Sequence, residues 1–217
     1  MTVQNFNSSQ EVAKDWWAMK NSLLPKFRAA IPNQAHAIFA RLHDRGLLGG
    51  IITQNIDSLH QRAGVPDDLV VELHGNMRDF ICSDHITALN PIPFGDGICD
   101  YRLPEAEAKL AGYEALPLCP RCGCPLRVET VMFGQPMPAD VMDSRVDMIR
   151  DCDLLLVIGS TLIVQPANVL PGVALHHRKP VVIINYGDET QYDEFADGLV
   201  CGPAGEFLSS VMQLMEM

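Results

Sequence analysis

"LLLVIGSTLIVQPANVLPGVALHHRKPVVIINYG", residues 154–187, is the stretch that decides the fold. It holds two apolar runs, Leu154–Ile158 and Val181–Ile184, which are continuous rather than alternating and are rich in Val, Ile and Leu. Such runs are typical of parallel strands that are covered on both faces. The segment between them is long enough for the crossover helix that parallel strands require. The sequence therefore predicts a βαβ unit and an α/β fold with an open, doubly wound parallel sheet.

Further elements of this fold are predicted upstream. Residues 33–46 read as a helix, with Asn33 as a plausible N-cap and Gly46 as a stop. Two shorter apolar runs, Ile51–Ile52 and Leu69–Val71, predict two more strands.

Composition excludes some classes of protein. The chain has 217 residues, 47% of them hydrophobic, which is enough for one domain with an insertion or for two small domains. Its net charge of −11 disfavours a nucleic-acid-binding surface, including that of a zinc-knuckle nucleic-acid protein. The sequence contains no run of 18 apolar residues and therefore predicts no membrane span. The seven cysteines are an odd number, and residues 1–17 lack the pattern of a secretory signal, so we expect a reducing, cytoplasmic environment and metal binding rather than disulfides.

Residues 80–127 differ from the rest of the chain. They contain five cysteines, many Pro and Gly residues and little periodicity. We interpret them as a small inserted module held by a metal, with residues 1–79 and 128–217 forming the main domain. Small, loop-rich modules generally need a bound metal or disulfides for stability, because their hydrophobic core is small.

The cysteine spacing predicts a structural zinc site. Cys119-Pro-Arg-Cys122-Gly is a knuckle in which two thiolates can face one ion, although a lone CxxC is often coincidental or redox-active. Cys82-Ser-Asp-His85 has the spacing of a second pair, and Cys99 competes with His85 as the fourth ligand. Four protein ligands would make this Zn²⁺ structural rather than catalytic.

Polar residues follow the two upstream strands. In "GGIITQNIDSLHQRAG", residues 49–64, the run Ile51–Ile52 ends in two amides and a carboxylate, which are costly to bury without partners. They either cap the next helix or line a pocket for a polar ligand. His74, in Glu-Leu-His-Gly, ends the next strand, where ligands gather in α/β sheets; the alternative is a structural histidine.

Two downstream turns have a similar double interpretation. Gly159-Ser160-Thr161 and Asn185-Tyr186-Gly187 each follow a predicted parallel strand. Small residues at a strand-to-helix turn let the backbone approach a ribose or a phosphate. The alternative is an ordinary turn.

Together these motifs resemble the sirtuin family of NAD-dependent protein-lysine deacylases, from about Phe27 to Phe207. The order and spacing of the motifs are specific. They are Pro32-Asn33-x-x-His36, Thr53 to Asp57 followed by Leu59-His60-x-x-Ala63-Gly64, Glu72 to Asn76, Cys119-Pro-x-Cys122-Gly, Leu126-Arg127, Val131-x-Phe133-Gly134, Gly159-Ser160-Thr161-Leu162-x-Val164-x-Pro166-Ala167 and Ile184-Asn185.

The resemblance implies an activity and a set of site residues. His74 resembles the general base, and Asn55 is the second catalytic candidate. The products would be nicotinamide, free lysine and O-acyl-ADP-ribose. The implied cofactor-binding residues are Gln54, Asn55, Ile56 and Asp57 at the nicotinamide end of NAD, and Gly159, Ser160, Thr161, Asn185, Tyr186, Gly187 and Cys201 at the adenosine half. The implied substrate-binding residues, which would hold an acyl-lysine peptide as an added strand, are Val131, Phe133, Gly134, Val164 and Pro166. The zinc ligands expected from the spacing are Cys82, His85, Cys119 and Cys122, although the family usually has a cysteine at the position of His85.

One part of the family pattern has no counterpart here. The family opens with a strand of the Rossmann-like sheet and a Gly-Ala-Gly phosphate loop, whereas residues 1–30 contain no glycine. Two hypotheses follow: a deacylase whose true start lies upstream of Met1, or a catalytically silent module that binds peptide or weakly binds ADP-ribose. In either case we expect residues 1–217 alone to bind NAD weakly and to turn over slowly, because no glycine turn cradles the pyrophosphate.

Overall fold

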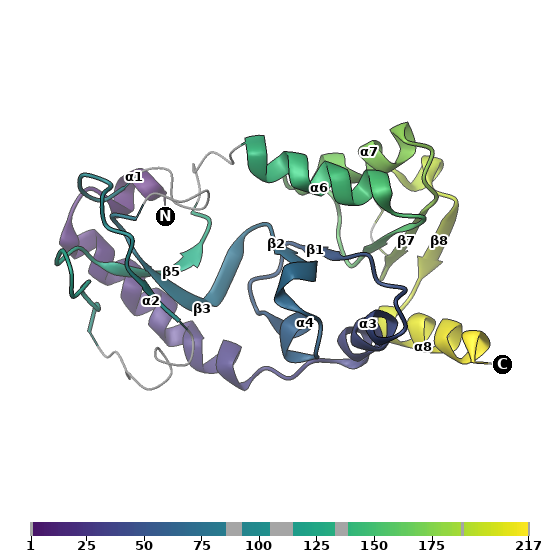
Figure 1. Cartoon of the computed structure of the whole chain (residues 1–217), viewed down its shortest axis with the longest axis horizontal. Helices are drawn as coiled ribbons and strands as arrows, with labels where there is room; N and C mark the ends of the chain where they lie inside the picture. The colour runs from purple at the N-terminus through teal and green to yellow at the C-terminus, as the bar shows by residue number, and fades with distance from the viewer. Residues whose placement is uncertain (1, 86–92, 105–114, 133–138, 188, 217) are drawn as a thin grey trace. The chain divides into compact units, whose positions relative to one another are not determined.

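The computed structural model describes residues 2–85, 93–104, 115–132, 139–187 and 189–216 (Figure 1). The chain divides into two compact units, and each is described by itself. The cysteine unit comprises Met1–Ala30, Thr53–Ser58 and Glu72–Val141. The α/β unit comprises Ile31–Ile52, Leu59–Val71 and Met142–Met217.

A parallel three-stranded sheet forms the centre of the α/β unit. Its strands are β6 (Leu155–Ile158), β7 (Val181–Asn185) and β8 (Gly198–Cys201), in the order β6-β7-β8. The crossover from β6 to β7 contains a 3-10 turn, η2 (Ala167–Val169), and the helix α7 (Leu170–His176). The predicted βαβ unit and parallel sheet are therefore confirmed.

Helices cover both faces of this sheet. Figure 1 shows α3 (Gln34–Asp44) and α8 (Ala204–Met215) on one face and α7 on the other, where it contacts β6 and β7. The unit also contains most of α6 (Ala139–Asp151), together with α4 (Leu59–Arg62) and the 3-10 turn η3 (Asp193–Phe195). The core on the α3–α8 side is formed by Ile38, Ile184, Leu208 and Met212. This double cover explains why β7 reads as a continuous apolar run.

The caps of α3 match the sequence prediction. Asn33 is the N-cap, and its side chain and that of His36 form a reciprocal capping box. Past the helix C-terminus, Gly46 has a φ of 68°, a left-handed conformation that glycine adopts without a Cβ penalty.

Two short strands link the units. β1 (Ile51–Thr53) pairs with β2 (Val70–Glu72) in a separate two-stranded sheet. Leu69, predicted as strand, ends the 3-10 turn η1 (Asp67–Leu69). Both strands begin in the α/β unit and end at the first residue of a cysteine-unit segment, Thr53 or Glu72.

An antiparallel sheet organises the cysteine unit. Its order is β4-β3-β5, with β3 (Gly75–Cys82) between β4 (Arg102–Leu103) and β5 (Leu126–Thr130). The helices α1 (Val3–Phe6) and α2 (Gln10–Ala29) complete the core. The Trp17 ring packs edge-on against Phe80 of β3, with 5.7 Å between ring centroids.

The cysteine unit is larger than the predicted module of residues 80–127, because it also contains residues 1–30, 53–58, 72–79 and 128–141. Residues 1–30 lie with the cysteines because Trp16 and Trp17 are buried in the core of that unit. The division of the chain into one domain of residues 1–79 and 128–217 and a second of residues 80–127 stays a prediction.

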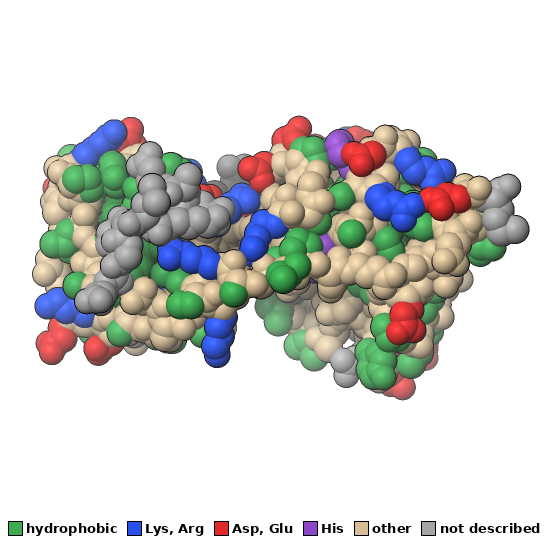
Figure 2. All heavy atoms as spheres, turned by 90° about the horizontal axis from the view of Figure 1, so that it is seen from below, with side chains coloured by type: hydrophobic (Ala, Val, Ile, Leu, Met, Phe, Trp, Pro, Cys, Tyr) green, Lys and Arg blue, Asp and Glu red, His purple; other side chains and the backbone are tan. Residues whose placement is uncertain are grey.

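Among the described residues, no helix is long and apolar enough to cross a membrane. Figure 2 shows basic side chains interspersed with acidic and apolar ones on one face of the molecule.

Candidate functional site

The polar segment after β1 is tied to the strand end that carries His74. Leu73 N donates to Thr53 O at 2.9 Å, and Met77 N donates to Ile56 O at 2.9 Å. Residues 53–58 and 72–77 all belong to the cysteine unit. Two main-chain hydrogen bonds therefore hold the two segments side by side, which brings together the residues predicted at the nicotinamide end of the site.

The orientation of the His74 ring is set by the main chain. Its Nδ1 lies 3.0 Å from Gln54 O. A carbonyl oxygen can only accept, so Nδ1 carries the proton and donates, and a neutral ring keeps its lone pair on Nε2. The carbonyl oxygen of His74 accepts from Val131 N at 2.9 Å. His74 is thus held on two sides and presents Nε2 as a proton acceptor.

Asn55 and Asp57 lie on the segment opposite His74. The main-chain N of Asn55 donates to Thr53 Oγ1 at 3.0 Å, which turns the chain sharply after β1, and the Asn55 side chain is exposed. Asp57 is half-buried, and the residue after it, Ser58, directs its hydroxyl to Glu72.

The second group of candidates lies at one end of the parallel sheet in the α/β unit. Ser160 N donates to Asn185 Oδ1 at 3.1 Å, and Asn185 Nδ2 donates to Ser160 O at 2.9 Å. Asn185 is only 8% exposed. Its amide therefore fixes the turn after β6, in which Gly159 has a φ of 62°. These two hydrogen bonds were not predicted from the sequence, because the family resemblance implied that Asn185 contacts NAD.

A small hollow lies beside this turn. It has a volume of about 170 Å³, and its lining includes Asn185, Gly187 and Cys201. Thr161 and Tyr186 are exposed near the same end of the sheet, Tyr186 to 80%. The predicted adenosine-half residues thus gather at the carboxyl end of β6, β7 and β8, where α/β folds bind nucleotides.

The peptide-binding candidates are divided between the two units. Val131 follows β5 in the cysteine unit and is bonded through its N to His74. Val164 is exposed and Pro166 is half-buried, both in the crossover of the α/β unit. Phe133 and Gly134 lie outside the described residues.

Four thiols converge in the cysteine unit. The sulfurs of Cys82, Cys99, Cys119 and Cys122 all lie within 4.8 Å of one another. The Cys82–Cys122 pair is 3.4 Å apart and the Cys99–Cys119 pair is 3.6 Å apart, yet all four are free cysteines. Burial raises the pKa of the Cys82 thiol, and the neighbouring thiols raise it further, so a divalent cation would compensate the charge of the thiolates. A closed set of four cysteines fits structural Zn²⁺.

His85 is not part of this cluster. It forms a backbone bridge with Ile98, immediately before Cys99. The sequence prediction placed His85 in the ligand set and kept Cys99 as its competitor. The structure instead places the Cys99 sulfur with the other three sulfurs. Cys124 lies with Asp84 and Cys122, and burial raises the pKa of its thiol to about 12.

Comparison with known proteins identifies relatives across the whole chain. A family model described as "Sir2 family" matches residues 1–166. A protein of Thermodesulfovibrio yellowstonii named "NAD-dependent protein deacetylase" is 34% identical over 218 residues, which cover 100% of this chain and 78% of that protein. A protein of Caldanaerobacter subterraneus named "NAD-dependent protein deacetylase 2" is 37% identical over 211 residues, covering 97% and 75% of the two chains.

Solved structures are similar in fold. One described as "Sir2 bound to acetylated peptide" has a TM-score of 0.80 and 30% identity, covering 99% of this chain and 82% of its own. Another, "Sir2-p53 peptide-NAD+", has a TM-score of 0.72 and 33% identity, covering 88% and 73%.

Proposed function

The chain belongs to the Sir2 family, and from this premise we propose that it is an NAD-dependent protein-lysine deacetylase that produces nicotinamide and O-acyl-ADP-ribose. The observation that carries the proposal is the identity of 34% with an NAD-dependent protein deacetylase over the whole of this chain. The geometry around His74 supports it, because the site offers a proton acceptor beside polar side chains that suit a nicotinamide ribose.

The proposed roles of the site residues follow from their positions. NAD supplies a glycosidic bond to nicotinamide whose cleavage drives the transfer of the acyl group. Asn55 and Asp57 are proposed to bind the nicotinamide end, since an amide and a carboxylate can bond a carboxamide and ribose hydroxyls. His74 accepts a proton at Nε2 from a ribose hydroxyl, because its Nδ1 proton is engaged by Gln54 O.

The adenosine half is proposed to lie at the end of the parallel sheet. Gly159 and Ser160 present main-chain groups there, and Asn185 holds their turn in shape. Thr161, Tyr186, Gly187 and Cys201 complete the proposed contacts. Gln54 and Ile56 are proposed to contribute through the main-chain segment that holds His74.

An acyl-lysine peptide is the proposed second substrate. Similar structures contain acetylated and propionylated peptides. Val131, Phe133, Gly134, Val164 and Pro166 are proposed to bind the peptide main chain as an added strand. Zn²⁺ held by Cys82, Cys99, Cys119 and Cys122 has a structural role in this proposal, and the seven free cysteines support a reducing, cytoplasmic location.

The proposal is tested by incubating the chain with an acetyl-lysine peptide, with and without NAD. Loss of the acetyl group that requires NAD supports the proposal. Loss of the acetyl group at the same rate without NAD would assign the chain to a different class of hydrolase.

A further inference from the structure

The residue that follows Asp57 has an unfavourable main-chain conformation. Ser58 has a φ of 54°, in the left-handed region that non-glycine residues rarely adopt, and it is only 6% exposed. A buried residue keeps such a conformation only where its surroundings enforce it. What holds Ser58 therefore also restrains the main chain next to Asp57.

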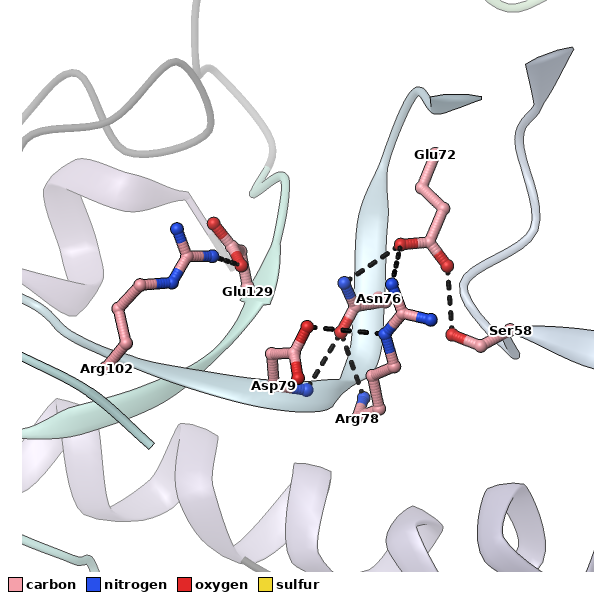
Figure 3. Close-up of polar contacts among 7 residues, drawn as sticks. All are labelled: Ser58, Glu72, Asn76, Arg78, Asp79, Arg102 and Glu129. Carbon is pink, nitrogen blue, oxygen red and sulfur yellow. Dashed lines mark hydrogen bonds and ion pairs between the residues drawn. The ribbon is translucent and has the colours of Figure 1, made fainter. Parts of the chain in front are cut away.

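Ser58 is held by Glu72. The Ser58 hydroxyl donates to Glu72 Oε1 at 2.9 Å (Figure 3). The second carboxylate oxygen, Oε2, accepts from Asn76 Nδ2 at 2.9 Å and from Arg78 Nη2 at 3.3 Å. The Glu72 side chain is 10% exposed, so its charge is compensated inside the protein rather than by bulk water. One carboxylate thus joins the segment of Asp57 to the strand end of His74.

The other end of this network shapes the chain after His74. Asn76 Oδ1 accepts from Arg78 N at 3.1 Å and from Asp79 N at 2.8 Å (Figure 3). This is where the pairing of β3 with β5 shifts register, between Gly75 and Phe80. Glu72 holds the Asn76 amide and therefore keeps its Oδ1 directed at the main-chain N–H groups of Arg78 and Asp79, where the register shifts.

We propose that Glu72 is a positioning residue for the nicotinamide end of the site, which holds Asp57 through Ser58 and the His74 strand through Asn76. The inference rests on the proposed function, and it adds residues to which the sequence motifs gave no role. Glu72 acts through these neighbours. Oε1 engages the segment of Asp57 and Oε2 engages Asn76 and Arg78 of β3, so removing the carboxylate releases the Asp57 segment from the His74 strand at this point.

The first test is amide hydrogen exchange, which needs no activity. Ser58→Ala removes the hydroxyl but keeps the main-chain strain, whereas Ser58→Gly removes both. Glu72→Gln keeps the shape of the side chain but replaces one acceptor oxygen with an NH₂ group, so Ser58 and Asn76 can no longer both donate to it. A matched control is Ser209→Ala, which removes a hydroxyl that bonds Gly205 O within α8.

All three site variants are expected to exchange at least about tenfold faster than the parent in peptides covering residues 53–58, with Ser209→Ala unchanged there. Exchange at the parent rate in Ser58→Ala or Glu72→Gln overturns the proposal. Fast exchange in Ser58→Ala alone, with Ser58→Gly at the parent rate, also overturns it, because strain rather than the hydrogen bond would then be responsible. Equally faster exchange across both units would indicate a general loss of stability and overturn it too.

The second test separates positioning from folding. In Glu72→Gln the KM for NAD is expected to rise at least about tenfold, while the KM for the acetyl-peptide stays within about twofold. Equal changes in both constants, or in neither, contradict the positioning role. If the parent shows no NAD-dependent turnover, the proposed function has failed, and the exchange measurement still decides whether Glu72 holds the segment of Asp57.

Discussion

The imidazole of His74 and the main-chain carbonyl of Gln54 are joined by a hydrogen bond of 3.0 Å through Nδ1. The bond crosses from the β2–β3 junction to the segment after β1, so one contact both orients the ring and ties together the two polar motifs. Because the carbonyl oxygen accepts, Nε2 of the neutral ring is left as the base. The contact supports the proposed role of His74 as a general base.

Replacing His74 with Ala is expected to lower the rate of NAD-dependent deacetylation by about 10²–10⁴-fold, since a general base contributes that much. Folding should be preserved, because the main-chain bonds of Leu73 and Val131 do not involve the ring. The measurement is kcat/KM together with a thermal melt. His177→Ala, at an exposed helix end in the α/β unit, is the control. Activity of His74→Ala within a few-fold of the parent would show that His74 is structural.

One zinc ion per chain is expected, held by the four clustered cysteines. Cys99→Ser and Cys119→Ser should each lose zinc and unfold less cooperatively, because a closed tetrahedral site needs all four ligands. His85→Ala should retain the metal. Elemental analysis of purified protein measures the ratio, with Cys152→Ser, outside the cluster, as the control. Loss of zinc from His85→Ala with full retention in Cys99→Ser would contradict the cluster assignment.

Gly75→Ala is expected to destabilise the cysteine unit by about 3–5 kcal/mol. A Cβ on Gly75 would lie 1.8 Å from Glu129 O, and its φ of 72° is also unfavourable for alanine. Gly46→Ala is the matched control, since Gly46 has a similar φ of 68° but no atom within 4 Å of the added carbon. That variant should lose only about 1 kcal/mol. Denaturant unfolding compares the two, and equal losses would mean that the close approach to Glu129 is relieved at little cost.

Asn185→Ala is expected to weaken NAD binding roughly tenfold, because it removes both hydrogen bonds that shape the Ser160 turn. The KM for the acetyl-peptide should change less, since no described contact joins Asn185 to Val164 or Pro166. Calorimetric titration of NAD gives the affinity. Unchanged NAD affinity would place the adenosine half away from this turn.

Part of this architecture could be predicted from the sequence. Leu154–Ile158 and Val181–Ile184 are long and continuous enough to specify parallel strands, and Asn33 and Gly46 mark the ends of a helix by local chemistry. No comparable signal in the sequence of residues 10–29 indicated against which part of the chain this helix packs. Trp16 and Trp17 are buried in the core of the cysteine unit, where they contact distant segments that periodicity cannot specify.

The site shows the same limit. Motif spacing identified Asn55, Asp57 and His74 as site candidates. Glu72 stands in the same motif as His74, but nothing in the sequence indicated that its carboxylate links their segments. Spacing favoured His85 over Cys99 as a zinc ligand, whereas in the folded chain the Cys99 sulfur lies with the other three. Hydrogen-bond partners across segments depend on the folded main chain, which a linear pattern does not contain.

The most direct test of the central claim is the product balance of the reaction with an acetyl-lysine peptide. It is run at millimolar NAD, because residues 1–30 contain no glycine turn for the pyrophosphate and weak binding is expected. Mass spectrometry should find nicotinamide, deacetylated peptide and O-acetyl-ADP-ribose in equal amounts, all absent without NAD and strongly reduced in His74→Ala. Free acetate formed with no nicotinamide, or no product that depends on NAD, would contradict the account.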